Sequence, residues 1–292
     1  MGMFDGKVAL VTGAAVGLGN AFARALAAEG AQLSVCDIRD EINALADAIG
    51  KPVLATKADV ANADDVRRVI DATMQRYGRI DILVSNAGVW AQTEATDSIE
   101  KTLKDYAYVV DTNLKGVFMF GRAVIPIMQK QGCGEIINIC TDHVQTCGSP
   151  FELTHDDAPN CPHAGLPPRI TGGGAAMDLY DASKWAHLGL TFAWAQALAA
   201  DNIRVNAMCM GATDSYMLRS FHNFSPSPEE QASWMKAEDS ARLMIDLIRD
   251  GRTGDYIGAA VGHPVVLPAR RANPYLMTAE GADAGRQTGA HA

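Results

Sequence analysis

Short apolar runs and amphipathic stretches alternate along most of this chain. The first strand-like runs, each given with the helical stretch that follows it, are 8–12 with 21–29, 32–37 with 41–49, and 53–58 with 64–77. The later strand-like runs are 82–85, 135–140, 204–208 and 256–261, separated by helical stretches that end near residues 130, 200 and 249. Because strand, helix and strand in succession form the unit of α/β folds, this alternation predicts about seven strands flanked by helices.

The strand-like runs are apolar throughout instead of alternating between apolar and polar residues. Strands of this kind are buried on both faces, as in a parallel sheet covered by helices. We therefore predict a doubly wound α/β fold, in a single domain over residues 1–262. Three stretches break the alternation, namely an insertion at 142–179 rich in Pro, Gly and His, a flap at 216–236 containing Ser-Pro-Ser-Pro, and an arm or tail at 263–292.

The composition is that of an ordinary globular protein and narrows the classes of function. Hydrophobic residues make up 48% of the chain and charged residues 20%, which supplies enough apolar material for a buried core. The formal charge of −9 argues against a nucleic-acid partner, because such proteins gather Lys and Arg into a basic face. No signal peptide or membrane-spanning stretch is recognised, so we expect a cytoplasmic protein with no membrane partner.

Cysteine and histidine spacing gives no sign of a metal site. The six cysteines lack the paired spacing of a zinc ribbon or a secreted disulfide framework, which favours reduced thiols. His143, His155, Cys161 and His163 gather in the insertion, but their spacing matches no standard metal site. We therefore expect no bound metal.

A glycine-rich turn directly follows the first predicted strand and opens the first helix. It reads Thr12-Gly13-Ala14-Ala15-Val16-Gly17-Leu18-Gly19. Glycines allow a sharp turn and bring backbone N–H groups against a pyrophosphate, whose charge also meets the positive end of the helix dipole. A turn of this kind could be structural alone, but its place between strand and helix favours a dinucleotide site.

Asp37 closes the second predicted strand, eighteen residues beyond Gly19. At this position a carboxylate accepts hydrogen bonds from the adenosine ribose hydroxyls and repels a 2′-phosphate. No Arg or Lys lies within the glycine turn, and Arg39 is the nearest cation to Asp37. Asp37 could be only a solvated residue at the end of a strand, but together with the glycine turn it favours NAD over NADP.

The spacing of the glycine turn resembles that of the short-chain dehydrogenase/reductase family, which has a Rossmann fold. Further stretches similar to motifs of that family follow in the same order: Asp59-Val60, Asn86-Ala87-Gly88, Asn113, Tyr180 with Lys184, Asn202 to Asn206, and Thr253-Gly254. The resemblance covers about residues 4–262. It implies that the first two stretches contact the dinucleotide and that Asn113, Tyr180 and Lys184 are catalytic.

Tyr180 and Lys184 lie four residues apart and so share one face of a helix. A free phenol has a pKa of about 10, too high for efficient proton transfer at neutral pH. A neighbouring ammonium and a cationic nicotinamide both favour the phenolate, so we expect a lowered pKa for Tyr180. Tyr180 is then the general base in oxidation and the acid in reduction, Lys184 also binds the nicotinamide ribose, and Asn113 holds a proton-relay water.

The chain departs from the family pattern near this predicted active site. Thr141 stands where the family usually has a serine that holds the substrate oxygen, and threonine keeps the hydroxyl while adding a methyl group. Cys140 is expected to pack beside it. Thr141 and Tyr180 are much further apart in sequence than in the family, so residues 142–179 carry an insertion whose ends adjoin catalytic positions. We expect part of it to border the substrate pocket.

After the sixth strand, Met210-Gly211 replaces the usual Pro-Gly of the family. The resemblance implies that Gly211 and the Thr213 backbone and Ser215 hydroxyl lie at the carboxamide of the cofactor. Five aromatic residues near these positions favour an apolar substrate, although they could equally be core or interface residues: Trp90, Tyr216, Phe221, Phe224 and Trp234.

Together these features predict an NAD-dependent alcohol dehydrogenase that interconverts a secondary, hydrophobic alcohol and its ketone. A homo-oligomer, dimer or tetramer, is expected. Two alternatives remain open at this point. One is an NADPH-dependent carbonyl reductase, which Asp37 opposes. The other is a dinucleotide-binding regulator without turnover, which the intact set of Asn113, Tyr180 and Lys184 opposes.

Overall fold

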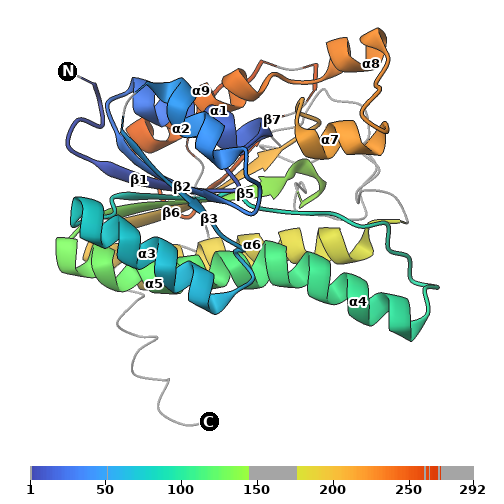
Figure 1. Cartoon of the computed structure of the whole chain (residues 1–292), viewed down its shortest axis with the longest axis horizontal. Helices are drawn as coiled ribbons and strands as arrows, with labels where there is room; N and C mark the ends of the chain where they lie inside the picture. Colours follow the sequence, from blue (N-terminus) through green and yellow to red (C-terminus); the bar gives the residue numbers. More distant parts are fainter. Residues whose placement is uncertain are drawn as a thin grey trace.

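Seven parallel strands form one sheet through the middle of the molecule (Figure 1). In the computed structural model, which describes residues 2–50, 52–144, 176–259, 261–262, 264–268 and 270, the strand order is β3-β2-β1-β4-β5-β6-β7. The strands are β1 (Val8–Thr12), β2 (Gln32–Asp37), β3 (Val53–Lys57), β4 (Ile82–Ser85), β5 (Gly134–Thr141), β6 (Ile203–Met210) and β7 (Tyr256–Ala259). The predicted doubly wound parallel sheet is confirmed.

Helices cover both faces of the sheet (Figure 1). One face carries α1 (Gly17–Ala28), α2 (Ile42–Ile49) and α9 (Ala237–Asp250), and the other carries α3 (Ala63–Tyr77), α4 (Ile99–Val110), α5 (Gly116–Gln131) and α6 (Asp178–Ala197). Neighbouring residues of one strand therefore join different cores. In β1, Val11 packs in the core beneath α1 and α9, whereas Leu10 packs in the core beneath α3 and α5.

Local signals explain where several helices begin and end. The Asn62 side chain caps α3 by accepting from the backbone N–H groups of Asp64 and Asp65, and Gly78 ends that helix in the left-handed conformation at φ 72°. Within the predicted flap, α7 (Tyr216–Phe221) and α8 (Pro228–Ser233) are short helices. The α8 helix starts with a capping box formed by Ser227 and Glu230.

The structure corrects the sequence-based element bounds in two places. The first helix begins at Gly17, inside the glycine turn, and not at residue 21. The long helical stretch that ends near residue 130 consists of α4, a π-helical turn η1 (Asp111–Lys115) and α5. The sequence pattern did not reveal η1, because a π turn inserts one extra residue into a helix and needs no particular residue type. Most of the predicted insertion, residues 145–175, lies outside the described residues.

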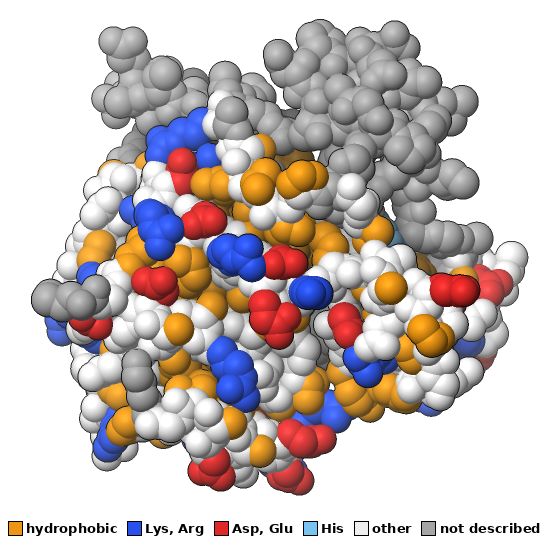
Figure 2. Space-filling model, turned by 90° about the horizontal axis from the view of Figure 1, so that it is seen from above, with side chains coloured by type: hydrophobic (Ala, Val, Ile, Leu, Met, Phe, Trp, Pro, Cys, Tyr) orange, Lys and Arg blue, Asp and Glu red, His pale blue; other side chains and the backbone are white. Residues whose placement is uncertain are grey.

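Charged side chains of both signs are interspersed on the face that carries α1, α2 and α9 (Figure 2). Along α9 they form ion pairs, with Arg242 next to Asp239 and Arg249 next to Asp246. The described residues of this face therefore carry charges of both signs side by side (Figure 2). None of the described helices combines the length and the apolar character needed to cross a bilayer.

Candidate active site

A cleft of about 1240 Å³ opens at the carboxyl ends of the strands. It lies where the strand order reverses between β1 and β4, which is the usual position of a ligand in an open parallel sheet. Fifteen of the predicted site residues line it: Gly13, Gly17, Leu18, Asp37, Asp59, Val60, Asn86, Ala87, Gly88, Thr141, Tyr180, Lys184, Gly211, Thr213 and Ser215. Gly19 and Asn113 are predicted site residues that do not line it, and both are buried behind its wall.

The glycine turn forms one wall of the cleft and has room for a phosphate. Gly13 has a positive φ of 63°, and a Cβ on Gly19 would run into the carbonyl oxygen of Gly13. The Asn86 amide donates to the carbonyl oxygens of Thr12 at 3.0 Å and Gly13 at 2.9 Å, which ties the turn to β4. No side chain caps the start of α1 at Val16. Its free N–H groups therefore suit the pyrophosphate of a dinucleotide.

Asp37 is buried at the end of β2, beside the glycine turn. Its carboxylate accepts hydrogen bonds from the backbone N–H of Ala15 at 2.9 Å and of Arg39 at 3.0 Å. The guanidinium of Arg39 lies over the Tyr216 ring, 3.8 Å from the ring centroid. Two backbone groups thus hold the carboxylate in a fixed position within the cleft, while the nearest cation is engaged by an aromatic ring.

Tyr180 and Lys184 lie together at the other end of the cleft, on the face of α6 that packs against the sheet. Their side chains are 8% and 4% exposed. The ammonium of Lys184 donates to the carbonyl oxygen of Ile139 at 2.9 Å and lies 5.8 Å from the centroid of the Tyr180 ring. Thr141, at the end of β5, lies beside Tyr180 and lines the cleft with it. The structure therefore brings together three of the four predicted catalytic side chains.

Burial controls the ionisation of these groups in the cofactor-free site. It raises the pKa of Tyr180, and the neighbouring Cys140 thiol adds to this effect, while the hydrogen bond from Thr141 opposes it. Burial also lowers the pKa of Lys184. In the protein without cofactor, burial therefore outweighs the contacts that favour the phenolate. A lowered pKa of Tyr180 beside both Lys184 and a bound nicotinamide stays a prediction.

Asn113 stabilises the wall of the cleft and does not project into it. Its amide oxygen accepts from the backbone N–H of Val89 at 2.8 Å, and its amide nitrogen donates to the Val89 carbonyl at 2.9 Å and to the Ser183 hydroxyl at 3.0 Å. These contacts join η1, the loop after β4, and α6. Protein groups thus hold both ends of the Asn113 carboxamide, and the relay water expected at Asn113 stays a prediction.

The residues after β6 connect the cleft to α7. The Thr213 hydroxyl donates to the Gly211 carbonyl at 2.9 Å, and the Ser215 hydroxyl caps α7 by accepting from the Leu218 N–H at 3.1 Å. A Cβ on Gly17 would lie 3.3 Å from that of Ser215, so the start of α7 packs against the glycine turn. The Thr213 and Ser215 hydroxyls therefore hold this connection in place, and the Ser215 hydroxyl is the one predicted to lie at the carboxamide.

Most of the five aromatic residues singled out from the sequence line the cleft. Trp90 and Phe221 stack with ring centroids 3.9 Å apart, and the Trp90 indole N–H donates to Ser220 at 3.1 Å. Tyr216 and Phe224 also line the cleft. Trp234 does not line it and instead packs beside His222, with ring centroids 5.2 Å apart. Four of the five aromatic residues are thus cleft residues.

Sequence reasoning missed several cleft residues that flank the catalytic positions. His143 lies in the cleft, hydrogen-bonds Asp181 at 2.8 Å, and places its ring edge-on to that of Tyr180 at 6.2 Å. Asp142 and His143 at one described end of the insertion, and Met177 at the other, line the cleft, as expected for a segment that borders the pocket. Their adjacency to Thr141 and Tyr180 in the sequence was the available signal. Among the described residues, no group of three His, Cys, Asp or Glu side chains could hold a metal ion.

A dinucleotide cradle that opens onto a buried tyrosine, lysine and threonine defines a nucleotide-dependent oxidoreductase. Comparison with known proteins narrows this class. The family model for short chain dehydrogenases matches residues 7–148 and 171–225, and the chain belongs to that family. The match covers both the glycine turn and the Tyr180 helix.

Relatives of known sequence or structure agree with this assignment. Oxidoreductase UcpA of Escherichia coli K12 is 33% identical over 264 residues, which cover 89% of this chain and 90% of that protein. The 3-oxoacyl-acyl-carrier-protein reductase FabG of Thermotoga maritima is 33% identical over 252 residues, covering 85% and 86%. The crystal structure of levodione reductase aligns with a TM-score of 0.71 at 27% identity, over 87% of this chain and 96% of that one.

Proposed function

We propose that this protein is an NAD-dependent alcohol dehydrogenase that interconverts a secondary, hydrophobic alcohol and its ketone. The observation that carries the proposal is that Thr141, Tyr180 and Lys184 meet at one end of a cleft whose other end holds Asp37. A hydroxyl pair that can bind an alcohol oxygen and a carboxylate suited to a ribose thus share one elongated site. Side chains that could transfer a proton argue against a regulator without turnover.

The site residues divide the reaction between them. In oxidation, Tyr180 takes the hydroxyl proton of the alcohol, while the Thr141 hydroxyl holds the same oxygen in place. NAD, when bound, accepts the hydride that leaves the alcohol carbon. Lys184 places a positive charge beside the Tyr180 phenol and so favours its ionised form. Asn113 keeps the Val89 loop and α6 in register around these groups. Reduction of the ketone runs through the same groups in reverse.

Asp37 supports NAD over NADP as the cofactor. Its carboxylate is buried and points into the cleft, where it would repel a 2′-phosphate, and its hydrogen bonds to Ala15 and Arg39 keep it there. Asp59 and Val60 line the cleft next to it. Among the structural neighbours, a 3-ketoacyl-acyl-carrier-protein reductase from Brucella melitensis was solved with NADH, and a dehydrogenase from Beutenbergia cavernae with NADP.

A homo-oligomer is also part of the proposal. Ile99, Leu103 and Tyr106 form a stripe along α4 and are 64%, 64% and 51% exposed. Glu100 and Lys104 flank this stripe, so a second copy of α4 packed antiparallel would meet both apolar and oppositely charged partners. Light scattering on wild type and Leu103→Asp tests this: a dimer or larger assembly that the substitution weakens supports it, and a wild-type monomer contradicts it.

The function is tested by following NADH absorbance with a panel of secondary alcohols and ketones. We expect turnover with NAD that exceeds turnover with NADP. Tyr180→Phe should abolish turnover while leaving NAD affinity largely intact, because it removes only the titrating hydroxyl. Tyr77→Phe is the matched control, since its hydroxyl donates to the Leu33 carbonyl at 2.9 Å, far from the cleft. Near-normal turnover in Tyr180→Phe, or a preference for NADP, would overturn the corresponding part of the proposal.

A further inference from the structure

His187 is a fully buried histidine one turn of α6 beyond Lys184. Tyr180, Lys184 and His187 are spaced four and three residues apart, so all three lie on the buried face of this helix. The Nε2 atom of His187 lies 2.7 Å from the main-chain carbonyl oxygen of Asn113. A polar ring at this depth, in contact with a predicted catalytic residue, is not explained by the reaction described above.

The contact with Asn113 fixes the protonation state of the imidazole ring. Burial, assisted by the charge of Lys184, lowers the pKa of His187 to about 3, so the ring is neutral and carries one N–H. A carbonyl oxygen only accepts hydrogen bonds, so this N–H must lie on Nε2. The Nδ1 atom therefore presents a lone pair. It is buried and has no hydrogen-bond partner among the described residues.

The surroundings of Nδ1 point to one donor. The nearby Ile139 carbonyl is itself an acceptor and cannot serve a lone pair. The same carbonyl accepts from the Lys184 ammonium at 2.9 Å, which brings that ammonium to the His187 ring and leaves it further hydrogens to donate. Gly88 lies beside both Asn113 and the lysine, because a Cβ there would lie 3.4 Å from the Asn113 amide oxygen and 3.5 Å from the Lys184 nitrogen.

We propose that His187 is a positioning residue of the active site: its Nε2–H holds the Asn113 carbonyl, and its Nδ1 accepts from one buried water to which the Lys184 ammonium donates. The assignment rests on the proposed function only in giving Lys184 a part in the reaction. The imidazole stabilises the ammonium in a buried site that otherwise disfavours its charge, and it aligns the ammonium with the Tyr180 phenol. It links α6 to η1 without itself changing charge.

Other titratable groups also face Tyr180 and Lys184 and bear on any pH dependence. Cys140 donates its thiol hydrogen to the Lys184 carbonyl at 3.2 Å, and Cys209 is its partner on the adjacent strand. The charges of Asp142 and Asp181 both raise the pKa of Tyr180, and the His143 ring hydrogen-bonds the Asp181 carboxylate. These groups surround the catalytic pair from β5, β6, η2 (Asp142–Val144) and α6. Unlike these described groups, His187 hydrogen-bonds the main chain of Asn113.

The first test reads the tautomer directly in the protein without cofactor or substrate. In protein labelled with ¹⁵N at histidine, the His187 signals, assigned by their loss in His187→Gln, should show a protonated Nε2 and an unprotonated, hydrogen-bonded Nδ1. They should not titrate around neutral pH. Lys184→Met should shift the Nδ1 signal and leave Nε2 nearly unchanged. A protonated Nδ1, a ring that titrates near neutral pH, or an Nδ1 signal insensitive to Lys184→Met would overturn the proposal.

The second test uses the pH profile of alcohol oxidation. His187→Val should lower kcat roughly tenfold, the loss of one hydrogen bond to a charged group, and move the acidic limb of the profile to higher pH. His187→Gln should restore much of both, because its amide supplies a donor and an acceptor. Thr191→Val is the matched control: Thr191 is buried one turn further along α6 and donates to the His187 carbonyl at 2.8 Å.

The outcomes separate this inference from the proposed function. An unchanged profile in His187→Val, or an equal shift in Thr191→Val, overturns the positioning role while leaving alcohol oxidation intact. If wild type oxidises no alcohol, or Tyr180→Phe retains turnover, the proposed function fails. The ¹⁵N signals then still decide whether His187 links Lys184 to Asn113.

Discussion

The hydroxyl of Tyr180 is subject to opposing electrostatic effects in this site. Burial and the Cys140 thiol raise its pKa, while the hydrogen bond from Thr141 and a bound positive charge lower it. The spacing of Tyr180 and Lys184 in the sequence could show that they share a helix face, but not how completely that face is buried. The residue types were therefore predictable, and the pKa of the phenol in the free protein was not.

This environment predicts that the Tyr180 phenol stays protonated in the free protein well beyond neutral pH. A difference titration of wild type against Tyr180→Phe, read at the tyrosinate absorbance, should show no ionisation of Tyr180 below about pH 10. Addition of NAD⁺ should bring the onset to lower pH, because the nicotinamide adds a positive charge beside the phenol. An onset near neutral pH without cofactor would contradict the effect assigned to burial.

Asp37 has a structural role beside the cofactor selection proposed for it, and substitutions can separate the two. Asp37→Ala with Ile38→Arg should shift preference toward NADP by removing repulsion and adding a phosphate partner. It should also lower stability by about 1–3 kcal/mol for each unsatisfied N–H, because Ala15 and Arg39 lose their acceptor.

Asp37→Asn is the control, since its amide oxygen can still accept a hydrogen bond but it carries no charge. The measurements are kcat/KM with each cofactor and thermal unfolding. Undiminished preference for NAD in both variants would show that Asp37 does not select the cofactor.

At the scale of the elements, continuous apolar runs separated by glycines and amphipathic stretches were enough to predict the parallel sheet and the helices that alternate with its strands. The β1 strand is buried at every position, as its apolar sequence indicates. The π turn η1 and the helices α7 and α8 were not predicted. Their geometry depends on tertiary contacts, such as those of Asn113 with Val89 and of Ser215 with the glycine turn. Distant partners of this kind leave no local pattern.

The α7 helix borders the cleft through Phe221, which stacks on Trp90 from the loop after β4. Trp90→Ala should raise KM for a bulky apolar alcohol more than for a small one, with little change in NAD affinity, because it removes an apolar wall. Phe221→Ala should act in the same direction. The two losses should be coupled by about 0.5–1.5 kcal/mol in a double-mutant cycle, as for other aromatic pairs.

Trp234→Ala serves as the comparison, because this aromatic side chain lies outside the cleft. Strict additivity of the Trp90 and Phe221 effects, or an equal effect of Trp234→Ala on KM, would rule out a specific substrate wall.

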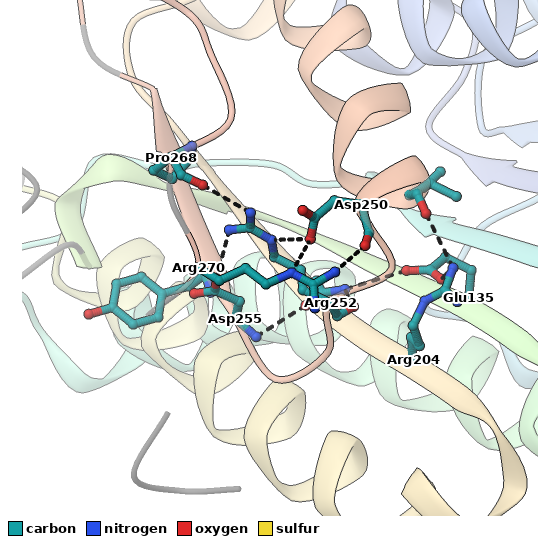
Figure 3. A network of polar contacts seen from close by, with 10 residues as sticks. Glu135, Arg204, Asp250, Arg252, Asp255, Pro268 and Arg270 are labelled. Carbon is teal, nitrogen blue, oxygen red and sulfur yellow. Dashed lines mark hydrogen bonds and ion pairs between the residues drawn. The ribbon is translucent and has the colours of Figure 1, made fainter. Parts of the chain in front are cut away.

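At the scale of the whole molecule, a polar network stabilises the amino ends of the strands, on the side of the sheet away from the cleft (Figure 3). Glu135, near the start of β5, forms an ion pair of 2.6 Å with Arg204 on β6. Arg252 donates to Asp250 at 2.7 Å, to Asp255 at 3.0 Å and to the Pro268 carbonyl at 2.9 Å, which fixes the segment after β7 against the domain. The network thus ties three strands together at a distance from the catalytic groups.

Glu135 makes this network sensitive to pH. Burial raises its pKa from 4.5 to about 8, against the opposing attraction of Arg204. The folded protein then binds this proton more tightly than the unfolded chain does. The contribution of Glu135 to the free energy of unfolding is fully present below the unfolded pKa and is lost as pH rises toward the folded pKa, by an amount on the order of several kcal/mol.

Glu135→Gln should therefore remove a decline in stability with rising pH. Glutamine keeps the shape and can accept from Arg204 without a buried negative charge, so the variant should unfold at a higher temperature than wild type at mildly alkaline pH. The difference should shrink in mildly acidic buffer, where Glu135 is protonated in the folded protein. Glu229→Gln, at an exposed position on α8, is the control. If the unfolding temperatures of Glu135→Gln and wild type differ by the same amount at every pH in this range, the ion pair with Arg204 keeps Glu135 charged throughout.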